Sequence, residues 1–404
     1  MKVAIFGLGY VGLPLAKLLK EKGAEVVGID PSLDAQKTAK EESIQISQDT
    51  TDSVKSADII IMCVPTPVDE SYKPNLAAVK SVAQDISKGL QKGQLICLES
   101  TINPGVSENI VLPILAESGL EPGVDFFMVH CPERVDPGNK DWDVHNIPRV
   151  IGGISDESLR RGIEFYTNYL DAKLHPVSSI RAAEATKIFE NSFRDINIAF
   201  VNEMAKSFDH FNIDVTEVIG AASSKPFGFL AHYPGCGVGG HCIPVDPYYL
   251  IESAKKKGFF HRFLTMARDV NNGMPQYTVE KLMDKLTEMG LYSPDLDICL
   301  LGLAYKKDVD DLRESPAFKI KELLESKGFS PKVYDPYLPD MSTISTLDAA
   351  CDSTCLLLVT DHTEFKGLEQ MDTKDVKLIF DGRNMLDKDK IKEKGIEYLG
   401  IGRN

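Results

Sequence analysis

Long hydrophobic runs are missing from this chain. Of its 404 residues, 43% are hydrophobic and 26% are charged, which is the balance of a soluble globular protein. None of the apolar stretches reaches the roughly 18 residues that a membrane-spanning helix requires, so we expect no membrane partner. The first apolar segment passes into a glycine turn at Gly7 without the apolar core of a secretory signal. We therefore expect a cytoplasmic location.

Positive charge is also scarce. The chain has 45 Lys and Arg against 60 Asp and Glu, a formal net charge of −15. Nucleic-acid binding usually needs a basic surface that neutralises phosphates. We expect no nucleic-acid partner, although local Lys and Arg side chains are sufficient to hold a small diphosphate.

Cysteine occurs, but not in the pattern of a disulfide framework or a zinc site. The eight cysteines are scattered and mostly lie in strand-like apolar runs, which predicts reduced thiols. The four His and Cys residues between 232 and 242 are close in sequence, but their spacing fits no standard zinc finger or ribbon. We expect no metal.

The hydrophobic pattern predicts two α/β regions separated by a helical one. Apolar strands alternate with helices in the first part of the chain, then helical patterns dominate, and then alternation returns. This order predicts two doubly wound, Rossmann-like domains joined by a long central helix. The expected regions are a dinucleotide-binding domain at 1–175, a central helical region at 176–290 and a second α/β domain at 291–404. The expected strands are 2–7, 25–30, 58–64, 94–99, 126–130, 297–302, 331–335, 354–360 and 376–381, and the expected helices are 11–22, 76–91, 180–211, 214–222, 247–257, 260–271, 275–289 and 316–327.

A dinucleotide fingerprint opens the chain. Gly7, Gly9 and Gly12 form a Gly-x-Gly-x-x-Gly motif between a strand and a helix, and Asp30 ends the next strand. The glycines permit a tight turn and close approach of a pyrophosphate, while the carboxylate can accept a hydrogen bond from a ribose hydroxyl. Because a carboxylate repels a 2′-phosphate, the pattern favours NAD over NADP. The alternative is a glycine-rich turn followed by an ordinary strand-end Asp.

Two later strand ends carry candidate cofactor contacts. Thr66 and Thr101 follow the strands at 58–64 and 94–99, at the edge where ligands bind in sheets of this kind. A turn-forming role beside proline explains both threonines equally well.

The stretch 237–247 presents a cysteine behind a glycine run, which predicts a flexible loop, and just before a helix start. A position near backbone N–H groups lowers the pKa of a thiol and favours the thiolate, so Cys242 is a candidate nucleophile. Together with a nicotinamide cofactor, such a cysteine indicates oxidation through a thiohemiacetal and a thioester. Asp246 has two interpretations, a helix N-cap followed by proline or a carboxylate that helps move protons.

A polar face runs along the predicted long helix. Lys187, Asn191 and Arg194 are spaced i, i+4 and i+7, so they share one side of an otherwise apolar helix. A buried amine beside an amide can stabilise an oxyanion, and Arg194 can bind a carboxylate or phosphate. A solvated helix face is the alternative. Glu133 and Arg134 follow another strand end, where Glu133 can activate water or the two can form a surface ion pair.

Taken together, these motifs resemble the UDP-glucose/GDP-mannose dehydrogenase family over nearly the whole chain. The resemblance implies a homodimer built on the central helices, NAD⁺ in the first domain and a UDP-sugar held largely by the second. It implies a four-electron oxidation of the sugar C6 alcohol to a carboxylate with two NAD⁺ and one water. The motifs are Gly7 to Gly12, CVPTP at 63–67, EST at 99–101, PER at 132–134, Lys187 with Asn191, GGHC at 239–242 with Asp246, GLAYK at 302–306 and DLRESP at 311–316.

The resemblance also implies a role for individual residues. Cys242 attacks the aldehyde stage, Lys187 and Asn191 stabilise the substrate oxygen, and the water is positioned or activated by Thr101, Glu133 and Asp246. The implied cofactor contacts are Gly7, Gly9, Tyr10, Val11, Gly12, Asp30, Thr66, Thr101 and Arg313. The implied substrate contacts are Arg134, Val135, Lys187, Asn191, Arg194, Gly239, Tyr305 and Lys306.

Within the family, the motifs are similar to the branch that acts on UDP-2-acetamido sugars. UDP-glucose enzymes usually carry Lys where Val245 stands and a second Glu where Pro137 stands. The segment 225–229, KPFGF, favours UDP-N-acetylglucosamine, with UDP-N-acetylmannosamine and then UDP-glucose as alternatives. The chain departs from the family in a shortened segment at 31–57, which predicts a more open adenosine side.

Two other functions compete with this interpretation. A two-electron NAD-dependent dehydrogenase also uses a Rossmann domain and a Lys–Asn helix, but it needs no cysteine. A non-catalytic nucleotide-sugar sensor would turn over no UDP-sugar. The number of NADH molecules formed per sugar distinguishes them.

Overall fold

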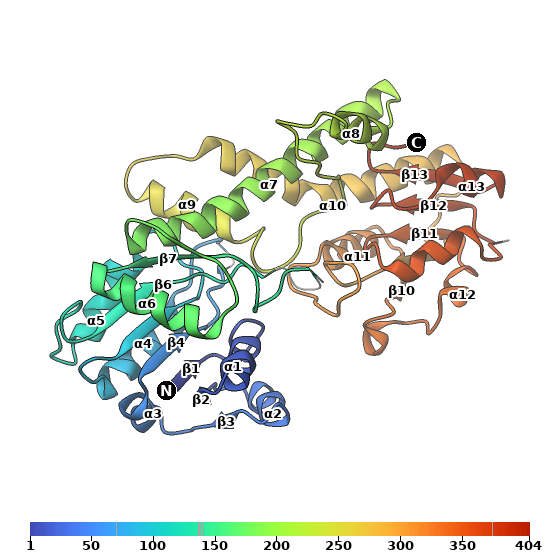
Figure 1. The fold of residues 1–404 in the computed structure, drawn as a ribbon. Coiled ribbons are helices and arrows are strands. Elements are labelled where there is room, and N and C mark those ends of the chain that lie inside the picture. Colours follow the sequence, from blue (N-terminus) through green and yellow to red (C-terminus); the bar gives the residue numbers. More distant parts are fainter. Residues whose placement is uncertain (70, 136–138, 140, 374) are drawn as a thin grey trace. The chain divides into compact units, whose positions relative to one another are not determined.

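The computed structural model describes residues 1–69, 71–135, 139, 141–373 and 375–404 (Figure 1). These residues form two compact units. Unit 1 consists of Met1–Asn191 and Val245–Phe260, and unit 2 of Ser192–Pro244 and His261–Asn404. The units are described separately below. Among the described residues, none of the helices is both long enough and apolar enough to cross a membrane.

Unit 1 is built on a sheet in which eight strands are identified in the described part of the chain. The strand order is β3-β2-β1-β4-β5-β6-β7-β8, and all neighbours are parallel except β6 and β7. This order confirms a doubly wound sheet in which the chain adds strands on one side of β1 up to β3 and then continues on the other side from β4, so the strand order reverses between β1 and β4. The strands are β1 Lys2–Phe6, β2 Glu25–Ile29, β3 Gln45–Ile46, β4 Ile59–Met62, β5 Leu95–Leu98, β6 Phe127–His130, β7 Arg149–Gly153 and β8 Leu174–Pro176.

The central strands of unit 1 are buried on both faces. In β4, Ile59 and Ile61 enter one apolar cluster, and Ile60 and Met62 enter the other. Helices must cover both faces of such a sheet, and Figure 1 shows them there. The helices of unit 1 are α1 Gly12–Glu21, α2 Leu33–Glu41, α3 Thr50–Ser56, α4 Ala77–Gly89, η1 Ser107–Val111, α5 Leu112–Ala116, α6 Asp156–Tyr169, the start of α7 Ile180–Phe211, and α9 Asp246–Lys255, which packs against α7.

Several elements of unit 1 were not expected from the sequence. The strand β7 has a weak sequence signal because it begins with a charged residue, Arg149, and ends in two glycines, and the sequence of α6 is rich in charged residues. Local signals nevertheless fix its start. The Ser155 hydroxyl accepts from the backbone N–H of Ser158 at 3.1 Å, and Asp156 lies in the first turn.

The central helices match the predicted positions with one correction. Helix α7 covers Ile180–Phe211, the predicted range, and α8 Val215–Ser223 follows it. The sequence predicted a break between 271 and 275, but α10 runs without interruption over Arg262–Glu288. Pro275 is buried inside this helix. Its packing compensates for the hydrogen bond that a proline removes from a helix interior.

Unit 2 contains a second parallel sheet, with five strands in the described residues. Their order is β10-β9-β11-β12-β13, which confirms the predicted α/β class for the C-terminal part. The strands are β9 Ile298–Leu301, β10 Lys332–Tyr334, β11 Cys355–Leu358, β12 Leu378–Asp381 and β13 Glu397–Gly400. The remaining helices are α11 Pro316–Ser326, η2 Pro339–Met341, α12 Leu347–Ala350, η3 Thr363–Glu369 and α13 Lys388–Glu393.

The same turn follows the first strand of each sheet. Gly7 after β1 and Gly302 after β9 both have φ of +91°, and a Cβ at either position would lie 2.4 Å from its nearest neighbour. An Asp at the end of the next strand then accepts the following backbone N–H. Asp30 accepts from Leu8 at 2.7 Å, and Asp335 accepts from the N–H after Gly302 at 2.6 Å.

The turn of unit 2 allows a test that separates backbone strain from crowding. Gly302 and Gly328 have φ of +91° and +90°, but a Cβ on Gly302 would lie 2.4 Å from Thr360, whereas one on Gly328 would lie 3.9 Å from Pro294. We expect Gly328→Ala to lower the free energy of unfolding by about 1–2 kcal/mol. Gly302→Ala should lower it by about 3–5 kcal/mol because overpacking is added. Urea unfolding followed by circular dichroism measures both, and equal losses would contradict the packing argument.

Candidate active site

The glycine turn of unit 1 leaves no room for a side chain at its first and last glycines, Gly7 and Gly12. A Cβ on Gly12 would lie 1.9 Å from the carbonyl oxygen of Gly7, so the first turn of α1 needs glycine there. Gly9, by contrast, has open space around its missing Cβ. The turn therefore keeps backbone N–H groups accessible at a helix N-terminus, which is the arrangement that binds a pyrophosphate.

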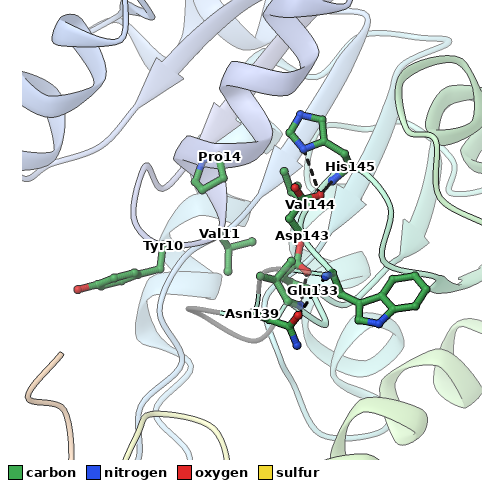
Figure 2. Close-up of a pocket in the computed structure, with 10 residues that line it drawn as sticks. Tyr10, Val11, Pro14, Glu133, Asn139, Asp143, Val144 and His145 are labelled. Carbon is green, nitrogen blue, oxygen red and sulfur yellow. Dashed lines mark hydrogen bonds and ion pairs between the residues drawn. The ribbon is translucent and has the colours of Figure 1, made fainter. Parts of the chain in front are cut away.

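A cavity of about 270 Å³ lies beside this turn. Figure 2 shows Tyr10, Val11 and Pro14 from the start of α1 on one side, and Glu133 with residues of the 139–145 segment on the other. Tyr10 is 61% exposed, and Val135 also lines the cavity. The structure thus brings predicted cofactor contacts next to Glu133. Pro137, one of the residues used to distinguish the sugar, lies outside the described residues.

Asp30 holds the glycine turn in place. Its Oδ2 accepts from the backbone N–H of Leu8 at 2.7 Å, and its Oδ1 accepts from the backbone N–H of Ser32 at 2.8 Å. The carboxylate is therefore fixed at the end of β2 before any ligand arrives. The shortened 31–57 segment folds into α2, β3 and α3.

The two candidate threonines follow β4 and β5, as predicted. Thr66 and Thr101 are both half-buried. The carbonyl of Thr66 accepts from the Tyr249 hydroxyl at 2.6 Å, and the Ser100 hydroxyl donates to the carbonyl of Val64 at 2.7 Å. These bonds fix the backbone at both strand ends, which is compatible with either interpretation of the threonines.

Lys187, Asn191 and Asp246 lie in the same unit, and two of them are bonded directly. The Asn191 amide donates to Asp246 Oδ2 at 2.5 Å, and all three side chains are buried. Asp246 is the first residue of α9, with Val245 at the N-cap position, so the N-cap interpretation of Asp246 is wrong. Burial raises the pKa of Asp246 to about 6, against the opposing charge of Lys187 and the Asn191 hydrogen bond. A carboxyl group of this kind exchanges protons near neutral pH.

Glu133 is not part of a surface ion pair. Its Oε1 accepts from the backbone N–H groups of Arg134 and Val135, each at 2.6 Å, and its Oε2 accepts from buried Arg149 at 2.7 Å. Arg134 forms a different pair, since its guanidinium donates to both carboxylate oxygens of Glu190 on α7. The sequence placed Glu133 correctly at the strand end but assigned its alternative partner incorrectly.

The cysteine loop belongs to unit 2. Cys242 is half-buried, and none of the eight cysteines, all of them described, forms a disulfide. Gly240 has φ of +86°, and its N–H donates to the carbonyl of Arg313 at 2.8 Å. A Cβ on Gly239 would lie 2.5 Å from Cβ of Tyr305, and one on Gly240 would lie 2.8 Å from the Tyr305 ring. The glycine run is therefore packed against 305–316 and is not a flexible loop as the sequence suggested.

The remaining predicted residues also lie in unit 2. Arg313 is paired with buried Asp311, to which its Nε donates at 2.9 Å. Lys306 is half-buried, whereas Arg194 is exposed on α7. The polar face predicted at 187–194 therefore divides, because Lys187 and Asn191 are buried in unit 1 and Arg194 belongs to unit 2.

Sequence reasoning missed the residues behind Glu133. Arg149, Glu99 and Tyr166 are buried and bonded to one another, and Tyr249 anchors α9 to Thr66. Glu99 was quoted only as part of a motif. The available signal was charge, because Glu99 and Arg149 stand at the edges of strand-like apolar runs, where a buried ion needs a partner.

Comparison with known proteins identifies the family. Three family models match: the UDP-glucose/GDP-mannose dehydrogenase NAD binding domain at residues 1–47 and 31–170, the central domain at 181–273 and the UDP binding domain at 299–388. The chain belongs to the UDP-glucose/GDP-mannose dehydrogenase family, and NAD is its cofactor.

Individual relatives match over nearly full length. The chain is 34% identical to a UDP-N-acetyl-D-mannosamine dehydrogenase of Methanococcus aeolicus, covering 100% of this chain and 96% of the relative. It is 32% identical to a UDP-N-acetyl-D-glucosamine 6-dehydrogenase of Pseudomonas aeruginosa, covering 96% and 98%. The solved structure of a UDP-D-ManNAc dehydrogenase from Pyrococcus horikoshii superposes with a TM-score of 0.91 at 31% identity, covering 100% and 99%.

The buried carboxyl group of Asp246 predicts an acidic limb in the pH dependence of turnover. Below a pH of about 6, Asp246 is protonated in the free protein, so kcat/KM should rise with pH through that value if the ionised form is required. Asn191→Ala removes a hydrogen bond that lowers the pKa of Asp246, so the limb should move to higher pH. Asn197→Ala on the same helix serves as the control. A limb that stays in place in Asn191→Ala would contradict the assignment.

Proposed function

We propose that the protein oxidises C6 of a UDP-2-acetamido sugar to the carboxylate in two NAD-dependent steps. The observation that carries this proposal is Cys242, held beside Gly239 and Gly240 in a chain that matches all three domains of a nucleotide-sugar dehydrogenase family. A two-electron dehydrogenase needs no such thiol, and a sensor needs no chemistry.

The turn at 7–12 fits the cofactor. A side chain on Gly7 or Gly12 would clash with backbone atoms, so the bare turn is suited to a pyrophosphate, and Asp30 is suited to the adenosine ribose. Tyr10, Val11, Thr66, Thr101 and Arg313 are further contacts in this proposal. When bound, NAD⁺ accepts a hydride from the substrate carbon in each of the two oxidations.

The chain's own residues carry the remaining steps. In the first oxidation the C6 alcohol loses a proton and a hydride and becomes an aldehyde. The Cys242 thiolate then bonds to the aldehyde carbon, and a second hydride leaves to give a thioester. Lys187 and Asn191 stabilise the negative oxygen, and both are buried, which strengthens their electrostatic effect. Asp246, bonded to Asn191, takes part in proton transfer.

Hydrolysis completes the reaction. Water attacks the thioester carbon, a proton of the water passes to Glu133, and the C–S bond breaks with its electrons left on the Cys242 sulfur. The products are the sugar acid and the thiolate. Thr101 positions the water in this proposal. The backbone of Arg134 and Val135 supports Glu133 directly, since both N–H groups donate to its carboxylate.

The nucleotide sugar is assigned to the UDP binding domain and to the cysteine loop. Tyr305 packs against Gly239 and Gly240. A ligand that contacts Tyr305 or Lys306 would therefore lie close to the loop that carries the thiol. Arg194 is exposed and remains suited to an anionic group. The guanidinium of Arg134 is already bonded to Glu190, so Arg134 contributes to the site in part through its backbone N–H, which donates to Glu133.

Two sugars are favoured by different observations. The segment 225–229 favours UDP-N-acetylglucosamine, and a 32% identical relative carries that activity in its name. The relative at 34% identity is named as a UDP-N-acetyl-D-mannosamine dehydrogenase, which favours the mannosamine epimer. We propose the glucosamine epimer as the first candidate and the mannosamine epimer as the second.

We propose a homodimer, which the central helices support, and a cytoplasmic location. Exposed aromatic side chains gather on two helices of unit 2, with Phe193, Phe200 and Phe211 on α7 and Phe263 on α10. Large apolar side chains that recur on one region usually mark a protein contact. Sedimentation of the purified chain tests the dimer.

NADH stoichiometry tests the proposed reaction. With limiting UDP-N-acetylglucosamine, UDP-N-acetylmannosamine, UDP-glucose or UDP-N-acetylgalactosamine and excess NAD⁺, the active sugar should yield two NADH per sugar. Cys242→Ala should lose this yield and lower steady-state turnover by about 10³-fold or more, because covalent capture of the aldehyde is removed.

Cys351→Ala is the matched control, since it removes another thiol of unit 2 that is buried near α12. It should keep the yield of two. A yield of one NADH in the wild type, or full activity in Cys242→Ala, would overturn the four-electron proposal. Failure of all four sugars would overturn the substrate class.

A further inference from the structure

A buried ionic network lies directly behind Glu133 in unit 1. Arg149, the first residue of β7, is 0% exposed, and its Nη1 donates to Glu99 Oε2 at 2.9 Å. Its Nη2 donates to Glu133 Oε2 at 2.7 Å. The Tyr166 hydroxyl on α6 donates to Glu99 Oε1 at 2.6 Å. One guanidinium thus joins two carboxylates that follow different strands.

Glu133 is the member of this network that reaches the cavity. It lines the cavity beside Tyr10 and Val11, and its Oε1 is held by two backbone N–H groups of its own loop (Figure 2). Glu99 lies deeper and is 1% exposed. Because both oxygens of Glu133 are bonded to fixed groups, the carboxylate has one orientation.

Burying this network costs hydration free energy, and a gain in stability alone does not explain why charged rather than apolar side chains are buried here. Each buried ion loses several kcal/mol of hydration, and apolar side chains of equal volume often stabilise a core as well. Burial would lower the pKa of Arg149, but the charges of Glu99 and Glu133 raise it well above its usual value. Burial raises the pKa of Glu99, opposed by Arg149 and Tyr166. Arg149 is therefore the fixed positive charge of the network.

Arginine is the side chain suited to this task. Its planar fork presents donors in fixed directions, so two carboxylates bonded to separate nitrogens are oriented relative to each other. A lysine at the same place would supply a point charge without that geometry. The neighbouring thiol of Cys131 adds no charge, because burial raises its pKa to about 12.

We propose that Arg149 is a positioning residue that orients the Glu133 carboxylate for activation of the water that hydrolyses the Cys242 thioester. Glu99 and Tyr166 hold Arg149 from the far side. This inference rests on the proposed function, in which Glu133 accepts the proton of that water. It adds that deacylation depends on a guanidinium which touches neither substrate nor cofactor.

Arg149→Lys in the full-length protein tests the inference. With NAD⁺ and the active sugar, the first two NADH per active site should form in a burst, followed by a slow steady state. We expect deacylation to slow by about 10-fold to 100-fold, because general base catalysis loses its alignment. kcat and KM should fall together, and kcat/KM should change less than about threefold, because substrate binding and the steps before the acyl adduct are untouched. Intact-protein mass spectrometry should find the sugar acyl adduct on Cys242.

Arg268→Lys is the matched control. Arg268 is a buried arginine of α10 whose Nη1 donates to buried Asp195, so its loss costs stability in the same manner. It should lower thermal stability without accumulation of the adduct. If Arg149→Lys also loses stability without adduct, Arg149 is only structural and the inference is overturned.

Two further variants keep the test decisive. If Arg149→Lys does not fold, Tyr166→Phe removes a single hydroxyl from the far end of the network and should slow deacylation by about threefold to tenfold. An unchanged deacylation rate there would overturn the inference. Glu133→Gln separates the two proposals. If the acyl adduct accumulates in Glu133→Gln but not in Arg149→Lys or Tyr166→Phe, the role of Arg149 is contradicted and the proposed function is not. If none of the variants forms two NADH in a burst, the proposed function itself is contradicted.

Discussion

The continuous helix α7 is the constraint on which the buried cluster of Lys187, Asn191 and Asp246 depends. A helix over Ile180–Phe211 gives residues to both compact units, and its first part carries Lys187 and Asn191 one turn apart. The Asn191 amide then fixes Asp246 at the start of α9, although 55 positions separate the two residues in sequence. One helix thereby sets the spacing between an amine, an amide and a carboxyl group.

Sequence patterns were sufficient wherever one signal controlled the local structure. The period of apolar residues without proline or glycine located α7 to the residue, and the glycine fingerprint with Asp30 located the first βαβ unit. Prediction failed where tertiary packing overrode a local rule. Pro275 remains inside α10 because its ring is buried, and the glycines before Cys242 pack on Tyr305. Tyr305 is far from these glycines in sequence, and the burial of Pro275 depends on tertiary packing, so no local pattern could reveal either feature.

The candidate site was predicted by residue type better than by partner. Glu133 and Arg134 were correctly taken as strand-end residues, yet each binds a different buried or half-buried ion, Arg149 and Glu190. Ion pairs across a sheet depend on which strands are neighbours. Strand β7 begins with Arg149 and pairs antiparallel with β6, and its charged first residue and two terminal glycines are weak strand signals. Missing that strand meant missing the charge behind Glu133.

Asp30 has a consequence for cofactor engineering. In both units an acid at the end of the second sheet strand accepts the backbone N–H that follows a glycine with φ of +91°. In unit 2 this acid is Asp335, which also forms a hydrogen bond with His362. Asp30 therefore serves the fold of the turn, in addition to the ribose contact proposed for it. A redesign toward a 2′-phosphorylated cofactor that simply replaces Asp30 also releases the backbone of Leu8 and Ser32, so a substitute acceptor has to be built with the new specificity.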